Sequence, residues 1–260
     1  MNRFIRLLLL PLLLLVPPFL HASDKGLPET LRVGTSAGYP PLTFEKDGQL
    51  TGMEIDLAKA VGEQLGMPVT FVETPFEELI SALNDGKFDV IMSGMSVTDE
   101  RSHSVLFTDP YLDIGQMALI RTDDLVEWSR PESMLSTSRT LGVKSGTTGE
   151  TFVTTTLPDA SVKHFDSIDA AVDALKARQI DIFIHDAPTI WRLGAEYEAW
   201  QSGLMGLYRP LTEEYLAWAV RRGDGELASA LNKALETLKT DGTLNRLRTR
   251  WIPVQVKVGN

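Results

Sequence analysis

The chain has 260 residues, of which 43% are hydrophobic and 23% charged, proportions typical of a globular protein rather than a disordered or collagen-like one. Its 35 acidic and 25 basic residues give a formal net charge of −10, which argues against a surface built to bind nucleic acid or an anionic membrane. The sequence contains no cysteine, so disulfides, thiolate nucleophiles and cysteine-ligated metal clusters are excluded.

The N-terminus has the pattern of a secretory signal peptide. Arg3 and Arg6 precede an apolar run over residues 7–20, which is shorter than the roughly 20 residues of a membrane-spanning helix and is interrupted by prolines. Ala22 supplies a small residue for cleavage, so we expect residues 1–22 to be removed on export; an uncleaved membrane anchor is the alternative. Because no cysteine is available for lipid attachment, the mature chain is expected to be free in the periplasm.

The first half of the mature chain alternates short apolar strands with amphipathic helices. The periodicity predicts strands over residues 31–35, 69–72 and 90–92, and helices over residues 53–65 and 76–83. Gly66 is placed to end the first of these helices. This alternation predicts a mostly parallel sheet covered by helices.

The same order of elements restarts after Gly115. The pattern predicts strands over residues 117–120, 140–143, 180–184 and 215–220, and helices over residues 168–177, 187–199 and, in two parts, 227–251. Two α/β units joined by extended segments near residues 111–115 and 211–215 account for this repetition. In such sheets ligands bind at the carboxyl ends of the strands, often in a crevice between lobes.

Motifs that would indicate catalysis are mostly absent. The sequence has no phosphate-binding glycine loop ending in Lys-Ser/Thr, no G-x-G-x-x-G and no G-x-S-x-G. His103, His164 and His185 do not have the spacing of metal ligands. No pair among the 35 acidic residues is singled out for catalysis, so we expect no catalytic residue, no metal and no cofactor.

Four short stretches together resemble one protein family. They are GTSAGYPPLTF at residues 34–44, SGMSVTDER at 93–101, VKSGTTG at 143–149 and IDIFIHDAP at 180–188, with FTDPY at 107–111 between them. In this order the chain resembles the periplasmic solute-binding proteins of polar-amino-acid ABC transporters (extracellular solute-binding proteins, family 3), from about Leu31 to Trp251.

The resemblance implies an α/β fold of the two-lobed periplasmic-binding-protein (Venus-flytrap) type. Each lobe would be a mostly parallel sheet flanked by helices, and a two-strand hinge would join the lobes. Residues 24–112 and 215–260 would form lobe 1, residues 116–210 would form lobe 2, and the hinges would lie near residues 111–115 and 211–215.

The resemblance assigns partners to both charged groups of a bound amino acid, which must leave water when the lobes close. Arg101 matches the ligand of the α-carboxylate, since a planar guanidinium can bond both oxygens at once. Ser96 would add donors beside it, and Thr148 would add an N–H group at the start of a helix expected from Glu150. A solvated surface arginine and a simple threonine turn are the structural alternatives.

Two further positions match the ammonium side of the ligand. The backbone carbonyl of Gly94 would face the ammonium, and Asp186, at a strand end on lobe 2, would pair with it. The carboxylate of Asp186 could instead, or also, cap the helix expected from Ala187.

The remaining matches concern the ligand side chain. Tyr39 and Phe76 match aromatic positions that enclose its aliphatic part, although Phe76 could belong to the core instead. Lys144 and His185 match variable positions near the side chain. Relatives specific for cationic amino acids carry Asp in the first loop, where this chain has Ser36, so a cationic ligand is not expected.

The expected function is therefore that of a monomeric periplasmic receptor that binds a free amino acid between its lobes and delivers it to the membrane subunits of an ABC importer. One alternative is an enzyme on the same scaffold, resembling the cyclohexadienyl (arogenate/prephenate) dehydratases. Their general acid is a Glu three residues after the position of Asp186, where this chain has Thr189. A second alternative is a ligand sensor that acts on a separate membrane protein.

Overall fold

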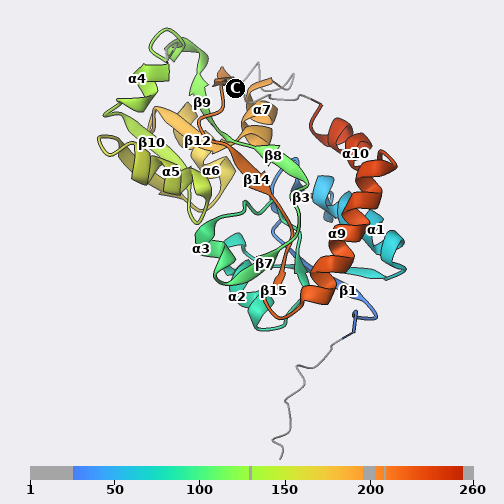
Figure 1. Cartoon of the computed structure of the whole chain (residues 1–260). Helices are drawn as coiled ribbons and strands as arrows, with labels where there is room; N and C mark the ends of the chain where they lie inside the picture. The colour runs from blue at the N-terminus through green and yellow to red at the C-terminus, as the bar shows by residue number, and fades with distance from the viewer. Residues whose placement is uncertain (1–25, 129–130, 196–202, 208, 254–260) are drawn as a thin grey trace, which may run out of the picture.

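The computed structural model describes residues 26–128, 131–195, 203–207 and 209–253. The expected signal peptide lies outside these residues. The described chain forms two lobes, each centred on a sheet with helices packed against it (Figure 1), which confirms the predicted two-lobed α/β fold. None of the helices in the described ranges combines the length and the apolarity needed to cross a membrane.

The first lobe is built on a sheet with the strand order β5-β1-β6-β15-β7. Its strands are β1 (Leu31–Thr35), β5 (Val69–Glu73), β6 (Val90–Ile91), β7 (Val105–Phe107) and β15 (Ala219–Arg221). Its helices are α1 (Met53–Leu65), α2 (Leu79–Asn84), α3 (Asp99–Ser102), α9 (Gly225–Thr240) and α10 (Thr243–Trp251). Only β15 runs against the other described strands of this sheet, which agrees with the expected mostly parallel arrangement.

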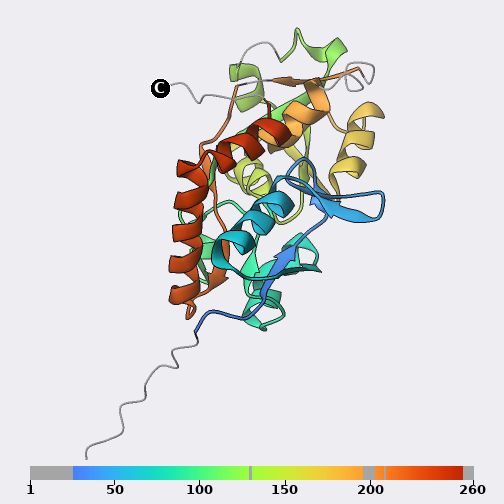
Figure 2. The same cartoon turned by 90° about the vertical axis from the view of Figure 1, so that its right-hand side faces the viewer.

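Alternating apolar side chains give this sheet a core on each face. Val90 packs in the cluster that includes residues of α1 and α9, whereas the next residue, Ile91, packs in the cluster of α2. On β15, Val220 and Ala219 divide between the same two clusters, because successive side chains of a strand point to opposite faces. Figure 2 shows α1, α9 and α10 grouped on one side of the lobe.

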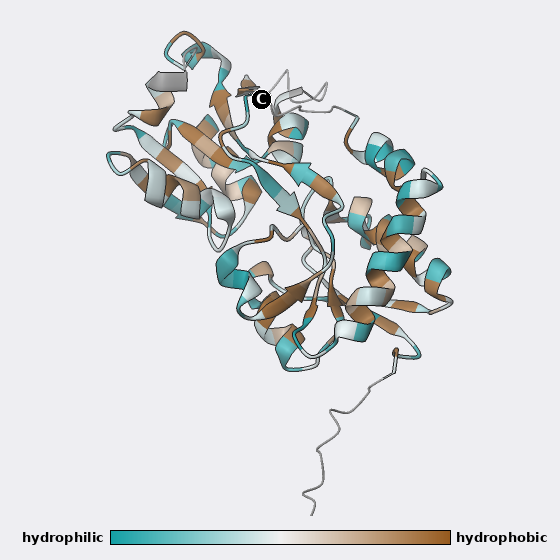
Figure 3. Ribbon diagram, in the orientation of Figure 1, coloured by the Kyte–Doolittle hydropathy of each residue, from teal (hydrophilic) through white to brown (hydrophobic). Residues whose placement is uncertain are grey.

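The second lobe is built on a sheet with the strand order β11-β10-β12-β9-β13. Its strands are β9 (Gln116–Arg121), β10 (Thr140–Lys144), β11 (Ser161–Phe165), β12 (Ile182–Asp186) and β13 (Leu204–Leu207). Its helices are α4 (Pro131–Leu135), α5 (Thr148–Thr156), α6 (Ile168–Lys176) and α7 (Ala187–Ala195). In both lobes the strands are largely hydrophobic and the outer turns of the helices are hydrophilic, as Figure 3 shows.

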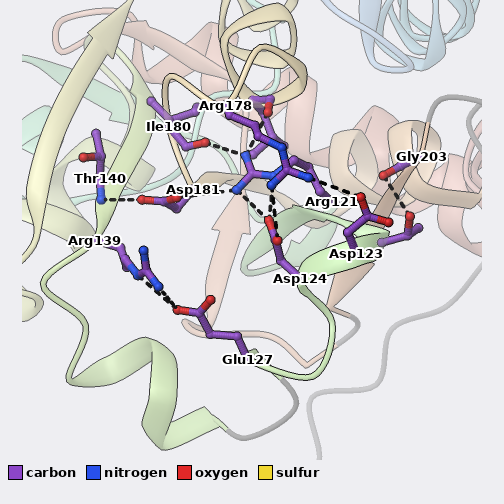
Figure 4. Close-up of polar contacts among 12 residues, drawn as sticks. Arg121, Asp123, Asp124, Glu127, Arg139, Thr140, Arg178, Ile180, Asp181 and Gly203 are labelled. Carbon is purple, nitrogen blue, oxygen red and sulfur yellow. Dashed lines mark hydrogen bonds and ion pairs between the residues drawn. The ribbon is translucent and has the colours of Figure 1, made fainter.

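A buried arginine ties the back of the second sheet to its helices. Arg121, at the end of β9, is 8% exposed. Its guanidinium donates to the carbonyls of Leu175 and Ile180, at 2.8 and 2.7 Å, and pairs with Asp124 at 2.6 Å and with Asp181 at 3.5 Å (Figure 4). A buried charge needs such partners to offset its desolvation, so we interpret this cluster as one that stabilises lobe 2.

Two short antiparallel strands connect the lobes. They are β8 (Leu112–Ile114) and β14 (Glu214–Leu216), and they pair with Glu214 opposite Ile114 and Leu216 opposite Leu112. The predicted single strand over residues 215–220 is therefore wrong. The chain leaves the connecting pair after Leu216 and enters the lobe 1 sheet at β15, and the intervening Trp218 donates its backbone N–H to Thr108.

Other boundaries shift slightly from the expected ones. The helix predicted over residues 76–83 begins as a 3₁₀ turn over Phe76–Glu78 and continues as α2. Part of the helix predicted over residues 187–199 lies outside the described residues. A small sheet of β2 (Gly38–Tyr39), β3 (Thr43–Lys46) and β4 (Gln49–Thr51), which the sequence pattern did not predict, leads into α1.

Candidate functional site

A cavity lies between the two lobes, and it contains all nine of the residues that the sequence singled out. The cavity opens to solvent, and about 400 Å³ of space free of protein atoms, open solvent included, lies between its walls. Its walls are Ser36, Gly38, Tyr39, Phe76, Gly94, Ser96, Arg101, Lys144, Thr147, Thr148, His185 and Asp186. The predicted residues come from loops, strand ends and helix starts spread between Tyr39 and Asp186, so the fold itself assembles this group.

Arg101 enters the cavity from lobe 1. It lies on the short helix α3, which begins after Thr98, whose hydroxyl accepts the Arg101 N–H. The guanidinium donates to the carbonyl of Ser96 at 2.9 Å and, across the cleft, to the carbonyl of Gly146 at 3.1 Å. Burial lowers the pKa of Arg101, and the charges of nearby acids oppose this shift. The residue is thus a partly buried cation with no carboxylate at ion-pair distance among the described residues.

Asp186 enters the cavity from lobe 2, at the end of β12. Its carboxylate accepts hydrogen bonds from the hydroxyl of Tyr39, on lobe 1, and from Nε2 of Gln116 at 2.5 Å. Burial, followed by the charge of Glu214, raises the pKa of Asp186 to about 6, although its hydrogen bonds and Arg101 favour the ionised form. A carboxylate held in this way gains from any additional positive charge that enters the cavity.

Gln116 and Glu214 belong to the same polar network, and neither was predicted from the sequence. Gln116 is fully buried, and its Nε2 also lies 3.0 Å from Glu214 and 3.1 Å from the hydroxyl of Thr148. The hydroxyl of Ser96 donates to Glu214 at 2.9 Å. Ser96 was expected to direct this hydroxyl at a ligand carboxylate, but in the structure Glu214 accepts it, because β14 brings that acid beside the loop after β6.

Helix α5 presents its N-terminus to the cavity two residues earlier than expected. It begins at Thr148 rather than at Glu150, because the hydroxyl of Thr147 accepts the N–H of Glu150 and acts as the N-cap. Thr148 therefore occupies the first helical position, where the backbone N–H has no partner within the helix. The turn before the helix is held by a hydrogen bond from Thr147 to the carbonyl of Lys144 at 2.7 Å.

Position 94 can accommodate only glycine in this arrangement. Its φ of +64° is strained for other residues, and a Cβ atom would lie 2.5 Å from the ring of Tyr39. Its N–H donates to the carboxylate of Glu54, a buried residue of α1, at 2.7 Å. Glu54 also accepts hydrogen bonds from Tyr111 at 2.5 Å and Trp218 at 3.1 Å. Glu54 was not predicted from the sequence as part of the site, although it is a charged residue on the buried face of α1.

The other end of the cavity combines aromatic rings with a lysine. Phe76 is half-buried: it lines the cavity and also packs against the core beside α2, so both of its expected roles are compatible with its position. Lys144 Nζ lies 5.3 Å from the centre of the Phe76 ring. His185 is buried, with its ring 5.4 Å from that of Tyr39, and burial, aided by the charge of Lys144, lowers its pKa to about 3. The imidazole is therefore neutral at physiological pH.

The arrangement suits a small ligand that carries both charges. A cation and an anion from opposite lobes face one cavity, beside a helix N-terminus and two aromatic rings. The described residues contain no group of three or more His, Asp or Glu side chains placed to hold a metal ion. Thr189 stands where the cyclohexadienyl dehydratases carry their general-acid Glu. Its side chain is fully buried, and its hydroxyl donates to the carbonyl of Pro40 at 3.1 Å, a hydrogen bond that joins the two lobes.

Comparison with known proteins identifies relatives over most of the chain. The ABC transporter arginine-binding protein 1 of Escherichia coli K12 is 30% identical over 239 residues, which cover 86% of this chain and 91% of the relative. The crystal structure of the ancestral amino acid-binding protein AncCDT-1, a precursor of cyclohexadienyl dehydratase, is 36% identical with a TM-score of 0.78, covering 86% of this chain and 95% of that one. A binding component of an ABC transporter from Wolinella succinogenes, complexed with lysine, is 31% identical with a TM-score of 0.81, covering 88% and 98%.

The family assignment follows from the sequence itself. Residues 31–254 match the bacterial extracellular solute-binding proteins, family 3, which includes every described strand and every side chain of the cavity. With this match, the shared two-lobed fold and the relatives above, the chain belongs to the bacterial extracellular solute-binding proteins of family 3.

Proposed function

We propose that this protein is a periplasmic receptor that binds a free, non-cationic α-amino acid between its lobes and delivers it to the membrane subunits of an ABC importer. Residues 24–112 and 215–260 act as one lobe, residues 116–210 act as the other, and the mature protein works as a monomer without lipid attachment. Relatives named as amino-acid-binding proteins of ABC transporters support this function.

The placement of Arg101 and Asp186 carries the proposal. An α-amino acid has a carboxylate and an ammonium on one carbon, and burying either charge without a partner costs several kcal/mol. The cavity offers a guanidinium from lobe 1 and a carboxylate from lobe 2. A zwitterion between them satisfies both, with additional N–H groups from α5 beside its carboxylate. A ligand that needs both lobes also stabilises their contact.

The route to this bound state is closure about the two connecting strands. The ligand makes its full set of contacts only when both lobes surround it, so binding shifts the population towards the closed form. Hydrogen bonds across the cleft, from Arg101 to the carbonyl of Gly146 and from Thr189 to that of Pro40, support this route, since they join the two lobes.

A binding role is favoured over the dehydratase alternative by Thr189. An elimination needs a proton donor near the leaving group, and a threonine hydroxyl bonded to Pro40 is a poor one. The ancestral relative named above is itself an amino acid-binding protein and a precursor of a dehydratase, so the scaffold is compatible with both roles.

A thermal-shift screen of the mature protein against the twenty L-amino acids tests the proposal. A ligand at about 100 times its Kd adds about 2.7 kcal/mol to the free energy of unfolding, which raises the melting temperature measurably. We expect at least one neutral or acidic amino acid to do so. If none of the twenty shifts the transition, the proposal is wrong.

Incubation with arogenate and prephenate separates a receptor from an enzyme. No phenylalanine or phenylpyruvate should form, even at high protein concentration and long incubation. Formation of either product at a rate proportional to protein concentration, and its loss in Asp186→Asn, would instead establish the dehydratase activity.

A further inference from the structure

Among the described side chains that line the cavity, the cations Arg101 and Lys144 outnumber the one carboxylate, Asp186. Arg101 and Asp186 account for the α-carboxylate and the ammonium. Lys144 remains, a half-buried residue at the end of β10 whose ammonium forms no hydrogen bond or ion pair within the described part of the chain. Burial lowers the pKa of Lys144, while the more distant charges of Glu77 and Asp166 favour the protonated form.

The position of Lys144 directs this charge at the ligand. Both its Nζ and the Arg101 guanidinium lie within 5.5 Å of the centre of the Phe76 ring, so a small molecule packed on that ring can reach both cations. The charge of Lys144 also contributes to the lowered pKa of His185, which indicates that the two side chains share this end of the cavity. The neutral imidazole offers no negative charge in return.

A second carboxylate, Glu214, lies behind the lining, where it accepts hydrogen bonds from Ser96 and Gln116. Its charge acts on Arg101 and Asp186, at the opposite end of the cavity from Lys144. Asp186 is the one carboxylate among the described side chains that line the cavity, and Tyr39 and Gln116 already donate to it. At the first loop, Ser36 offers a hydroxyl. A cationic side chain in this cavity would therefore meet Lys144 without a counter-charge, and such like-charge contacts are strongly unfavourable.

We infer that Lys144 is a specificity-determining residue and that the ligand is an amino acid with an acidic side chain, whose second carboxylate pairs with the Lys144 ammonium. This inference rests on the proposed function and names the substrate class within it. A charge-assisted N–H···O bond in a partly desolvated site is stronger than one to a neutral acceptor. The preference should therefore show most clearly between ligands of the same shape that differ only in charge.

Calorimetric titration of the mature protein with individual amino acids tests the inference. The ligands are two matched pairs, glutamate with glutamine and aspartate with asparagine, and the two cationic amino acids lysine and arginine. We expect the acid of at least one pair to bind at least tenfold more tightly than its amide, and the cationic ligands at least 100-fold more weakly than that acid. In Lys144→Met the preference of acid over amide should fall to threefold or less.

Lys163→Met is the matched control. Lys163 lies on the neighbouring strand β11, and its Nζ is 5.4 Å from the centre of the Phe165 ring, but it is exposed and lies outside the cavity. This variant removes the same charge from the same lobe and should keep the preference. Two results would overturn the role of Lys144: a preference for the acid that persists in Lys144→Met, or one that is lost in Lys163→Met.

The outcomes also separate the two proposals. Tightest binding of an amide, an apolar or a cationic amino acid would overturn the acidic substrate class and leave the receptor function intact. Absence of binding by all of the amino acids would overturn the receptor function, and the inference with it.

Discussion

At the scale of single residues, the cavity holds charged side chains whose ionised forms are disfavoured by burial. Burial lowers the pKa of Arg101 and raises that of Asp186, so in both residues it favours the neutral form. A zwitterionic ligand supplies the missing opposite charge to each. Binding of a zwitterion thus offsets the cost that burial imposes on the charged forms of both residues, which is why the two residues should dominate affinity.

Replacing Arg101 with Ala should abolish binding of every α-amino acid, because the residue serves the carboxylate that all of them share. Loss of one partner of a desolvated charge pair costs about 2–5 kcal/mol, or about 30-fold to several thousand-fold in Kd. Arg101→Lys should recover little, since an ammonium lacks the bidentate fork. Calorimetry checks the affinity and circular dichroism the fold.

Arg139→Ala is the control for this change. Arg139 is an exposed lobe 2 arginine paired with Glu127 at 2.7 Å, and its loss should leave affinity unaltered. Binding by Arg101→Ala within a few-fold of the wild-type protein would show that the carboxylate is held elsewhere.

The raised pKa of Asp186 makes affinity depend on pH. Since the ligand ammonium pairs with the ionised carboxylate, affinity should be constant above pH 7 and fall through about pH 6, with about a tenfold loss by pH 5. His185 does not contribute, because its pKa of about 3 keeps it neutral over this range. Titrations from pH 5 to pH 8 should show this profile, and Asp186→Asn should bind weakly with a flat profile.

The stability of the protein without ligand should change with pH in the opposite direction to its affinity for the ligand. The pKa of Asp186 is raised from an ordinary value of 3.8 to about 6. Its contribution to stability is therefore fully present below about pH 3.8 and is lost as the pH rises through 6. A wild-type affinity that rises on acidification would contradict the pairing of ionised Asp186 with the ammonium.

Apart from Phe76, the cavity residues that were predicted lie in the short motifs that carry the family resemblance, and the residues that support them do not. Arg101, Thr148 and Asp186 each follow a recognisable stretch at a strand end. Gln116 and Glu214 are single polar residues at the starts of β9 and β14, and only the pairing of β9 with β12 and of β14 with β8 brings them near Asp186. Local spacing carries no information about such long-range contacts.

At the scale of elements, Glu54 links the cavity to both connecting segments. Its carboxylate accepts from Gly94 in the loop after β6, from Tyr111 before β8 and from Trp218 between β14 and β15. Helix α1 thereby fixes the loop that forms the cavity wall and the two chain segments that leave the lobe. Burial raises the pKa of Glu54, and the three donors oppose that shift.

Replacing Glu54 with Ala should destabilise the protein strongly. Three buried donors would lose their acceptor, each at a cost of about 1–3 kcal/mol, so we expect a loss of at least about 3 kcal/mol in the free energy of unfolding, measured by urea denaturation. Glu63→Ala, an exposed position of the same helix, is the control and should leave the midpoint unchanged. An unchanged midpoint in Glu54→Ala would mean that the network contributes nothing.

Long periodic elements were predicted well, and short ones were not. Helices α1, α6 and α9 carry clear apolar faces, and strands β1, β10 and β12 are mostly buried and contain several apolar residues each. Strands of two to four residues such as β2, β8 and β14 are too short to show a period. The break between β14 and β15 is invisible for the same reason, since residues 215–220 form one apolar run.

At the scale of the whole molecule, two lobes meet over a cavity and are joined by the thin ribbon of β8 and β14. A pair of three-residue strands offers little resistance to bending compared with the packed sheets on either side. The central claim is therefore that the ligand, held between Arg101 and Asp186, selects the closed arrangement of two rigid lobes.

Distance measurement between spin labels on the two lobes tests this claim most directly, and the absence of native cysteine makes the labelling specific. Glu78 on lobe 1 and Thr156 on lobe 2 are exposed near the groove between the lobes, and suit a Glu78→Cys/Thr156→Cys pair. A Glu63→Cys/Asp85→Cys pair within lobe 1 is the control. Saturating ligand should shorten and narrow the distance distribution between the lobes and leave the control pair unchanged, and Arg101→Ala should show no response. An inter-lobe distribution that stays the same at saturation would contradict closure around the ligand.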